Sequence, residues 1–207
     1  MKKLVIALSL FAAATLATTP ALAQSNKKPA QPQTPASPVP GKPGDSNIVE
    51  IALGVNAQSG EFSYLLGAIG CLTDEETEYN PVVELLSGED MYTVFAPTDA
   101  AFIALQGALG ISSPSPEATC ALGDETVFNV LAYHVTWGRR FSNSVFNPNS
   151  SKMIEMLNEA YVTSNPNLTF TDVAGQTIGI VSADLVNLNA SNGVIHVIDT
   201  VLLPFVP

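Results

Sequence analysis

The chain has little positive charge and few side chains suited to catalysis. Its 207 residues include 8 lysines and arginines against 19 aspartates and glutamates, and only 2 histidines. The net charge of −11 repels phosphate backbones and anionic lipid headgroups, so we expect no nucleic-acid partner and no direct membrane insertion. Cationic partners and divalent ions remain compatible with this charge.

Catalytic and cofactor motifs are also missing. The chain has no Gly-x-Ser-x-Gly elbow, no His-x-x-x-His pair and no glycine-rich phosphate loop. Any nucleophile–base or zinc site would have to use His134 or His196. We therefore expect no enzyme activity, no catalytic or metal-binding residues and no cofactor.

Long apolar runs are confined to the beginning of the chain. Two lysines precede an apolar stretch over residues 4–17, and the small-residue motif Ala-Leu-Ala at 21–23 stands before polar Gln24. The stretch is shorter than the ~20 residues that a membrane-spanning helix needs, and its layout is that of a secretory signal peptide over residues 1–23. We expect a secreted protein of bacterial type, in the periplasm, at the cell surface or outside the cell. A short buried helix is the alternative.

Residues 24–45 contain almost nothing that a core could bury. Proline, glutamine, serine, lysine and glycine dominate this segment, a composition typical of a disordered or polyproline-like linker. The loose Pro-x-x-Pro spacing of its prolines leaves a docking ligand as an alternative. We interpret the segment as a tether that holds a folded domain away from a surface.

Residues 46–207 have the length of one ordinary domain. They carry 3 basic and 18 acidic residues, and a solvated acidic surface that keeps a secreted protein soluble is the simplest explanation of this charge. Cys71 and Cys120 are the only cysteines, and an exported chain passes through an oxidising compartment, so we expect a disulfide between them. Two buried thiols are the alternative. We expect a single domain and a monomer.

Apolar residues at helical spacing predict helices early in this domain. Ser46 or Asn47 can cap the first, Ser59 the second, and Asn80 a third that begins at Pro81. Four acids before the third helix are predicted to form a solvated loop: Asp74, Glu75, Glu76 and Glu78. Calcium binding there is the alternative, although the ordered spacing of an EF-hand loop is absent.

Segment 93–102 combines a strand and a helix start, and reads TVFAPTDAAF. Pro97 breaks a short β-prone run, Thr98 can cap the next helix, and Asp99 places a negative charge in its first turn.

This segment, together with NVLAYHV at 129–135 and NGVIHVID at 192–199, closely resembles the signature stretches of fasciclin-like domains. The resemblance covers essentially residues 46–207. It implies an α+β fold, a β-wedge or sandwich with N-terminal helices packed against it. The signature residues are Thr98, Asp99, Asn192, Gly193 and His196. The chain departs from the family pattern in the insertion at 74–79 and at 158–160, where a glycine often appears, so local loop shapes there are expected to differ.

Asn192 and Gly193 predict a β-hairpin without reference to any family, because both central residues of a type I′ turn need positive φ. Pairing outward from this turn predicts the following register: Ser191 opposite Val194, Ala190 opposite Ile195, Asn189 opposite His196 and Leu188 opposite Val197. The runs at 176–181 and 168–170 are predicted as a third and a fourth strand.

Tyr133 and His134 form the one pair with a sharp functional interpretation. In eukaryotic family members the equivalent Tyr-His segment has been implicated in binding to cell-adhesion receptors, and the resemblance implies such a role here. The alternative, which we favour, is that both side chains end an apolar helix over 127–135 and are packed and hydrogen-bonded in place. Arg139 and Arg140 are predicted to form intramolecular ion pairs, and a basic docking site is the alternative.

The resemblance implies a non-enzymatic adhesion or interaction module that binds a protein or glycan at the cell surface or in extracellular matrix. The alternative that the resemblance implies is a carrier of a small apolar ligand such as a carotenoid, since some fasciclin-like proteins have been linked to carotenoid binding. A wedge between sheet and helices could open a groove for such a ligand.

Overall fold

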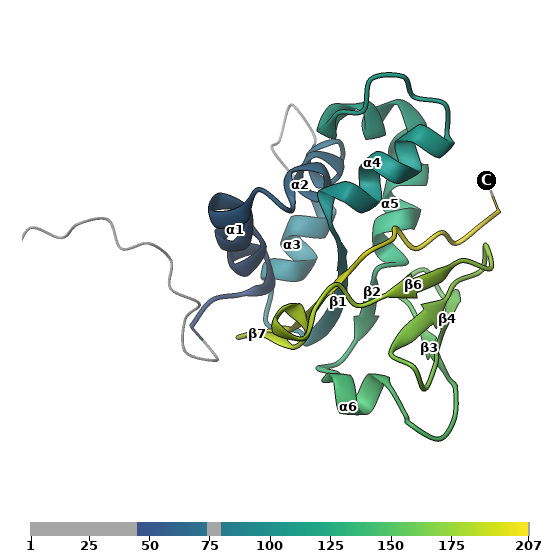
Figure 1. The fold of residues 1–207 in the computed structure, drawn as a ribbon. Helices are drawn as coiled ribbons and strands as arrows, with labels where there is room; N and C mark the ends of the chain where they lie inside the picture. The colour runs from purple at the N-terminus through teal and green to yellow at the C-terminus, as the bar shows by residue number, and fades with distance from the viewer. Residues whose placement is uncertain (1–44, 74–79, 207) are drawn as a thin grey trace, which may run out of the picture. The chain divides into compact units, whose positions relative to one another are not determined.

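The computed structural model describes residues 45–73 and 80–206. The predictions for the signal peptide, for the proline-rich linker up to residue 44 and for the acidic loop at 74–79 lie outside these ranges. The described part is a mixed α+β fold, with a helical layer, a central four-stranded sheet and a second four-stranded sheet (Figure 1). Within it, no helix is long and apolar enough to cross a membrane.

The helical layer consists of α1 (Ile48–Ser59), α2 (Ser63–Gly70), α3 (Pro81–Ser87), α4 (Asp99–Ala108), η1 (Pro116–Leu122) and α5 (Asp124–Ala132). Asn47 accepts a hydrogen bond from the backbone of Glu50, and the Glu50 carboxylate accepts one from the backbone of Asn47, which completes a capping box. The predicted caps Asn80 and Thr98 are confirmed. Local capping chemistry therefore fixes where three of these helices begin.

The prediction that Ser59 caps the second helix is wrong. α1 runs through Ser59, whose hydroxyl donates to the Val55 carbonyl one turn earlier at 2.9 Å. α2 begins after Phe62, and the Asn56 side chain of α1 accepts a hydrogen bond from the Phe62 N–H at 3.0 Å. A residue of the preceding helix thus organises the chain at this corner.

The central sheet contains β1 (Tyr92–Pro97), β2 (Val135–Trp137), β7 (Leu188–Ala190) and β8 (Gly193–Ile198), in the order β2-β1-β8-β7. β1 and β8 are parallel, with Val94 opposite Ile195, and the other pairs are antiparallel. The three signature segments therefore meet in one sheet, since they contribute β1, the approach to β2, and β8.

The hairpin between β7 and β8 exists, but its predicted register is wrong. Ala190 lies opposite Gly193, so Ser191 and Asn192 form the turn, and Leu188 lies opposite Ile195. Neither Asn192 nor Gly193 is among the residues with positive φ, so the turn is not type I′. The hydrogen bonds of the Asn192 side chain and the lack of space for a side chain at Gly193, described below, determine the turn in place of the local preference.

The second sheet is an antiparallel meander of β3 (Lys152–Glu155), β4 (Tyr161–Ser164), β5 (Thr169–Thr171) and β6 (Thr177–Gly179). The predicted strands at 168–170 and 176–181 correspond to β5 and β6, which pair with each other. Glu159, in the turn between β3 and β4, has a φ of 66°, a conformation that favours glycine. The turn lies at 158–160, where the sequence was expected to depart from the fasciclin-like pattern. Two short helices complete the fold: α6 (Ser142–Val145) and η2 (Ala183–Leu185).

Two apolar cores lie on the two faces of the central sheet. Alternation along β1 sends Val94 into the core shared with the helical layer and Phe95 into the core shared with the second sheet. Along β8, Ile195 and Ile198 are divided in the same way. The central sheet is therefore buried on both faces, as expected where two parallel strands form its middle.

Candidate functional site

Tyr133 and His134 lie at the junction of α5 and β2, and both side chains are buried. Tyr133 is 0% exposed and His134 is 3% exposed. His134 Nδ1 lies 2.7 Å from the Val130 carbonyl oxygen, and the Leu202 N–H donates to Nε2 at 2.9 Å. A ring that donates at Nδ1 and accepts at Nε2 is a neutral imidazole. The histidine therefore joins the end of α5 to the C-terminal segment.

Burial also determines the ionisation of this pair. Desolvation lowers the pKa of His134 from 6.5 to about 4 and raises the pKa of Tyr133 from 10.0 to about 12. The Tyr133 hydroxyl donates to the Tyr161 carbonyl at 2.8 Å and accepts from the Val173 N–H at 3.2 Å. Both side chains use their polar atoms on the protein's own backbone, and both rings are buried.

His196, on β8, has the opposite tautomer. Its Nε2 lies 2.8 Å from the Arg140 carbonyl oxygen, and the Asn187 N–H donates to Nδ1 at 3.2 Å. The ring is fully buried and stacks on Phe95, and desolvation lowers its pKa below 6.5. In the described residues, neither histidine is hydrogen-bonded to a serine, threonine or cysteine side chain, so neither forms a nucleophile–base pair.

Asn192 and Gly193 join segments that are distant in the sequence. Asn192 Oδ1 accepts from the Ile48 N–H at 2.9 Å, and Nδ2 donates to the Leu86 carbonyl at 2.7 Å. At Gly193, a Cβ atom would lie 2.1 Å from the Tyr92 carbonyl oxygen. Glycine is needed here for the close approach of β1, and the asparagine ties α1 and α3 to the same corner.

Thr98 and Asp99 connect the starts of two helices. The Thr98 hydroxyl accepts from the Ala101 N–H at 3.3 Å, which caps α4. The Asp99 carboxylate accepts from the Tyr64 N–H at 2.9 Å, and Tyr64 is the second residue of α2. Asp99 therefore satisfies a free N–H of α2, a helix that has no side-chain cap of its own.

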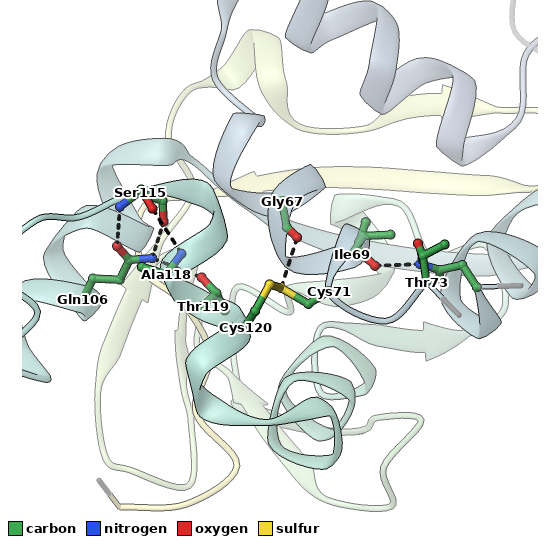
Figure 2. Close-up of a disulfide and its surroundings, with 10 residues drawn as sticks. Gly67, Ile69, Cys71, Thr73, Gln106, Ser115, Ala118, Thr119 and Cys120 are labelled. Atoms are coloured by element: carbon green, nitrogen blue, oxygen red, sulfur yellow. Dashed lines mark hydrogen bonds between the residues drawn. A yellow bond between two sulfur atoms is a disulfide. The ribbon is translucent and has the colours of Figure 1, made fainter. Parts of the chain in front are cut away.

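The predicted disulfide is confirmed and holds η1 against α2. Cys71 follows α2, Cys120 lies in η1, and their Cα atoms are 5.2 Å apart (Figure 2). Beside it, Gln106 of α4 accepts from the Ser115 N–H at 3.0 Å and donates to the Ser115 carbonyl at 2.8 Å. Gln106 also donates to the Thr119 hydroxyl at 3.0 Å (Figure 2). A covalent bond and a buried amide thus hold the same short segment.

The ion pairs predicted for Arg139 and Arg140 are wrong, since neither arginine forms one within the described ranges. The Arg139 guanidinium donates to the carbonyls of Ala190 and Ser191, the latter at 2.9 Å. Arg140 Nε donates to the Trp137 carbonyl at 3.0 Å. One guanidinium nitrogen of Arg139 therefore bonds to the last residue of β7 and to the first residue of the turn that follows it.

Asp172 is a buried carboxylate to which the sequence patterns did not point. It is 7% exposed and accepts from the Gln176 N–H at 2.8 Å and the Leu203 N–H at 2.9 Å. The signal that could have found it is the tight turn ending near Gly175, which has a φ of 80°. Aspartate commonly accepts hydrogen bonds from backbone N–H groups in such turns.

An apolar cavity of about 350 Å³ lies between the first three helices and the central sheet. Its wall is built mainly of apolar side chains, among them Ile48, Ala52, Leu65, Val82, Val94 and Ile195. The volume lies within the ~300–1,000 Å³ of small-molecule sites. A groove between sheet and helices was expected from the resemblance to fasciclin-like domains, whereas none of these lining residues was predicted.

Comparison with known proteins gives consistent results. The model of the fasciclin domain family matches residues 76–204. Protein sll1483 of Synechocystis sp. is 35% identical over 161 residues, which are 76% of this chain and 73% of that protein. Among solved structures, a FAS1 domain pair from the insect cell adhesion molecule fasciclin I matches 77% of this chain, with a TM-score of 0.52 and 13% identity. The match covers 51% of the domain pair, and at this identity it shows the fold alone.

Proposed function

We propose that this chain, which belongs to the fasciclin domain family, is a secreted or surface-displayed module that binds a protein or glycan partner and catalyses no reaction. Fasciclin domains are generally adhesion and interaction modules of extracellular proteins. In this proposal one monomeric domain is exported by the signal peptide and held away from a surface by the proline-rich tether.

The observation that carries this proposal is how polar residues of the signature stretches 129–135 and 192–199 are used. Their side chains bond to the protein's own backbone: His134 and His196 at both ring nitrogens, and Asn192 at both amide atoms. Such a core holds a scaffold in place and leaves its surface free to vary. Recognition by the exposed surface of a rigid scaffold is the arrangement expected of an interaction module.

Binding to cell-surface material tests this proposal. The full mature protein is immobilised, and its binding of surface and matrix extract from the producing cells is measured before and after treatment of the extract with protease or with glycosidases. We expect saturable binding that one of the treatments removes. Binding that does not saturate, or that heat-denatured protein reproduces, contradicts the proposal.

The cavity of about 350 Å³ favours a second candidate, the carriage of a small apolar ligand. Its lining offers many apolar contacts and few polar groups, and Asn80 and His134, which border it, already have hydrogen-bond partners in the protein. A ligand there would be recognised by shape and apolar contact.

The ligand is sought in protein purified from its own cells. A visible absorption spectrum and mass spectrometry of an organic extract detect a bound pigment or lipid. Ala52→Phe, which fills the cavity, is expected to abolish co-purification, whereas Ala57→Phe on the exposed side of α1 is not. An extract free of apolar molecules contradicts this second candidate.

A further inference from the structure

A second apolar groove, of about 220 Å³, lies between α4, η1, α5 and the C-terminal segment and is here termed the α4–α5 groove. Three of its lining side chains remain partly exposed, Leu109 at 40%, Leu122 at 37% and Phe205 at 39%. The groove is smaller than the ~300–1,000 Å³ typical of small-molecule sites, so it suits one or two side chains of a partner.

The wall of this groove that η1 forms is fixed in the unbound protein. η1 is bonded to α2 through Cys71 and Cys120 and to α4 through Gln106 (Figure 2). α2 also approaches η1 closely, since a Cβ atom on Gly67 would lie 2.5 Å from the Cβ of Pro116. Because the wall does not have to be ordered on binding, a partner would lose less free energy to ordering than at a mobile loop.

The surroundings of the groove are acidic. Asp124 and Glu125 occupy the first turn of α5, between the lining residues Leu122 and Thr126 in the sequence, and Glu117 lies in η1. All three carboxylates are on exposed residues. Residues 46–132 contain no lysine or arginine, and neither does the C-terminal segment. The elements around the groove therefore carry no compensating positive charge.

We propose that the α4–α5 groove binds a polypeptide segment that carries one or two large apolar side chains next to lysine or arginine. The proposal rests on the interaction role proposed above and specifies the chemistry of the partner. The apolar side chains fill the groove, and the cations face the carboxylates around it, as in other interfaces with an apolar centre and a charged rim. Acidic segments are repelled.

Selection from a random library tests the chemistry without prior choice of a ligand. Phage displaying random 12-residue peptides are selected on the full mature protein, and enriched peptides are synthesised and measured by fluorescence polarisation. We expect sequences with lysine or arginine beside leucine, isoleucine or phenylalanine, and an affinity that falls as salt is raised. Enrichment of acidic or uncharged peptides, or no enrichment, overturns the proposal.

Variants locate the binding. Leu109→Ala combined with Leu122→Ala is expected to weaken peptide binding by about tenfold or more, since central apolar contacts dominate interfaces. Ile103→Ala combined with Phe128→Ala is the matched control, because these residues lie on α4 and α5, are 44% and 45% exposed, and do not line the groove. Equal losses in the two double variants, or no loss in either, overturn the proposal.

Two neighbouring carboxylates, Asp124 and Glu125, allow an independent test of the electrostatic part of the proposal. Asp124→Asn with Glu125→Gln is expected to weaken peptide binding roughly threefold to tenfold and to reduce its salt dependence. Glu84→Gln, in the first turn of α3, is the control for a helix-start carboxylate away from the groove. Identical salt dependence in the parent and the Asp124/Glu125 variant contradicts the role of these carboxylates.

Binding of surface extract, measured on the same variants, distinguishes this inference from the function on which it rests. Extract binding that survives in the Leu109/Leu122 variant overturns the groove as the partner site while the interaction function stands. Absence of extract binding in the parent protein, with peptide binding intact, contradicts the proposed function instead.

Discussion

The two halves of the domain differ most clearly in charge. Residues 46–132, which form the helical layer and β1, contain 13 acidic residues and no lysine or arginine, whereas residues 133–207 contain 5 acidic and 3 basic residues. The apolar cavity of about 350 Å³ and the α4–α5 groove are both lined mainly by residues of the helical half. The later half contributes the second sheet and most of the aromatic core beneath it. The interaction function proposed above would therefore use the surface of the helical half, with the sheets as its support.

The core between the sheets is built around Phe170. Its ring centroid lies 4.8 Å from that of Phe95, edge to face, and 4.8 Å from that of Phe146. Phe170→Ala is expected to lower the free energy of unfolding by about 3 to 5 kcal/mol, because a large cavity replaces the ring. Urea denaturation measures this. Phe128→Ala on the helical surface is expected to change stability by less than about 1 kcal/mol, and equal effects would remove the contrast between the halves.

The disulfide stabilises the helical half. Reduction of Cys71–Cys120 is expected to cost about 2 to 4 kcal/mol, since the closed loop spans 49 residues. Urea denaturation with and without reductant measures the cost. Because η1 forms a wall of the α4–α5 groove, reduction is also expected to weaken peptide binding before the domain unfolds. Unchanged stability after complete reduction would contradict this assignment.

Acidification is expected to destabilise the sheet core through its histidines. Burial lowers the folded-state pKa of His134 to about 4 and that of His196 below 6.5, while the unfolded chain has the ordinary value. The unfolded state therefore binds protons first, and stability that is complete above pH ~6.5 falls as the pH drops toward 4, on the order of 3 kcal/mol for His134. Titration of the two imidazole NMR resonances checks the shift, and values near 6.5 in the folded protein would refute it.

Gly193 gives the smallest of these expected effects. Gly193→Ala places a methyl group against the Tyr92 carbonyl, and we expect a loss of about 1 to 3 kcal/mol. Gly107→Ala in α4 is the matched control, because nothing lies within 4 Å of its Cβ position and alanine favours the helix by roughly 0.5 to 1 kcal/mol. A neutral Gly193→Ala variant would show that β1 and β8 can move apart at low cost.

The sequence predicted features that depend on neighbouring residues. Asn47, Asn80 and Thr98 cap helices by bonding to N–H groups two or three residues away, so their patterns are legible locally. The family resemblance supplied the α+β fold. The predicted hairpin register failed because Asn192 bonds to Ile48 and Leu86, which no local turn rule can anticipate.

In the candidate site, too, local features were predicted from the sequence and contacts between distant residues were not. The sequence indicated that His134 is structural, because it ends an apolar helix, but not that Leu202 is its partner across the fold. The ion pairs of the arginines were predicted from charge alone, whereas Arg139 donates to backbone carbonyls at the turn between β7 and β8, some 50 residues away in the sequence. The apolar cavity and the α4–α5 groove depend on how the helices pack against each other and against the sheet. The spacing of apolar residues in the sequence does not predict such gaps.

The most direct test of the account is His134→Ala, measured for stability and for binding in the same preparation. The Tyr133–His134 segment is buried in the scaffold, so the variant is expected to lose roughly 1 to 3 kcal/mol of stability, because the Leu202 N–H loses its acceptor. Well below its melting temperature, the variant is expected to bind surface extract with the affinity of the parent. A variant that melts like the parent yet no longer binds would place recognition at Tyr133 and His134 and contradict the division between scaffold and surface.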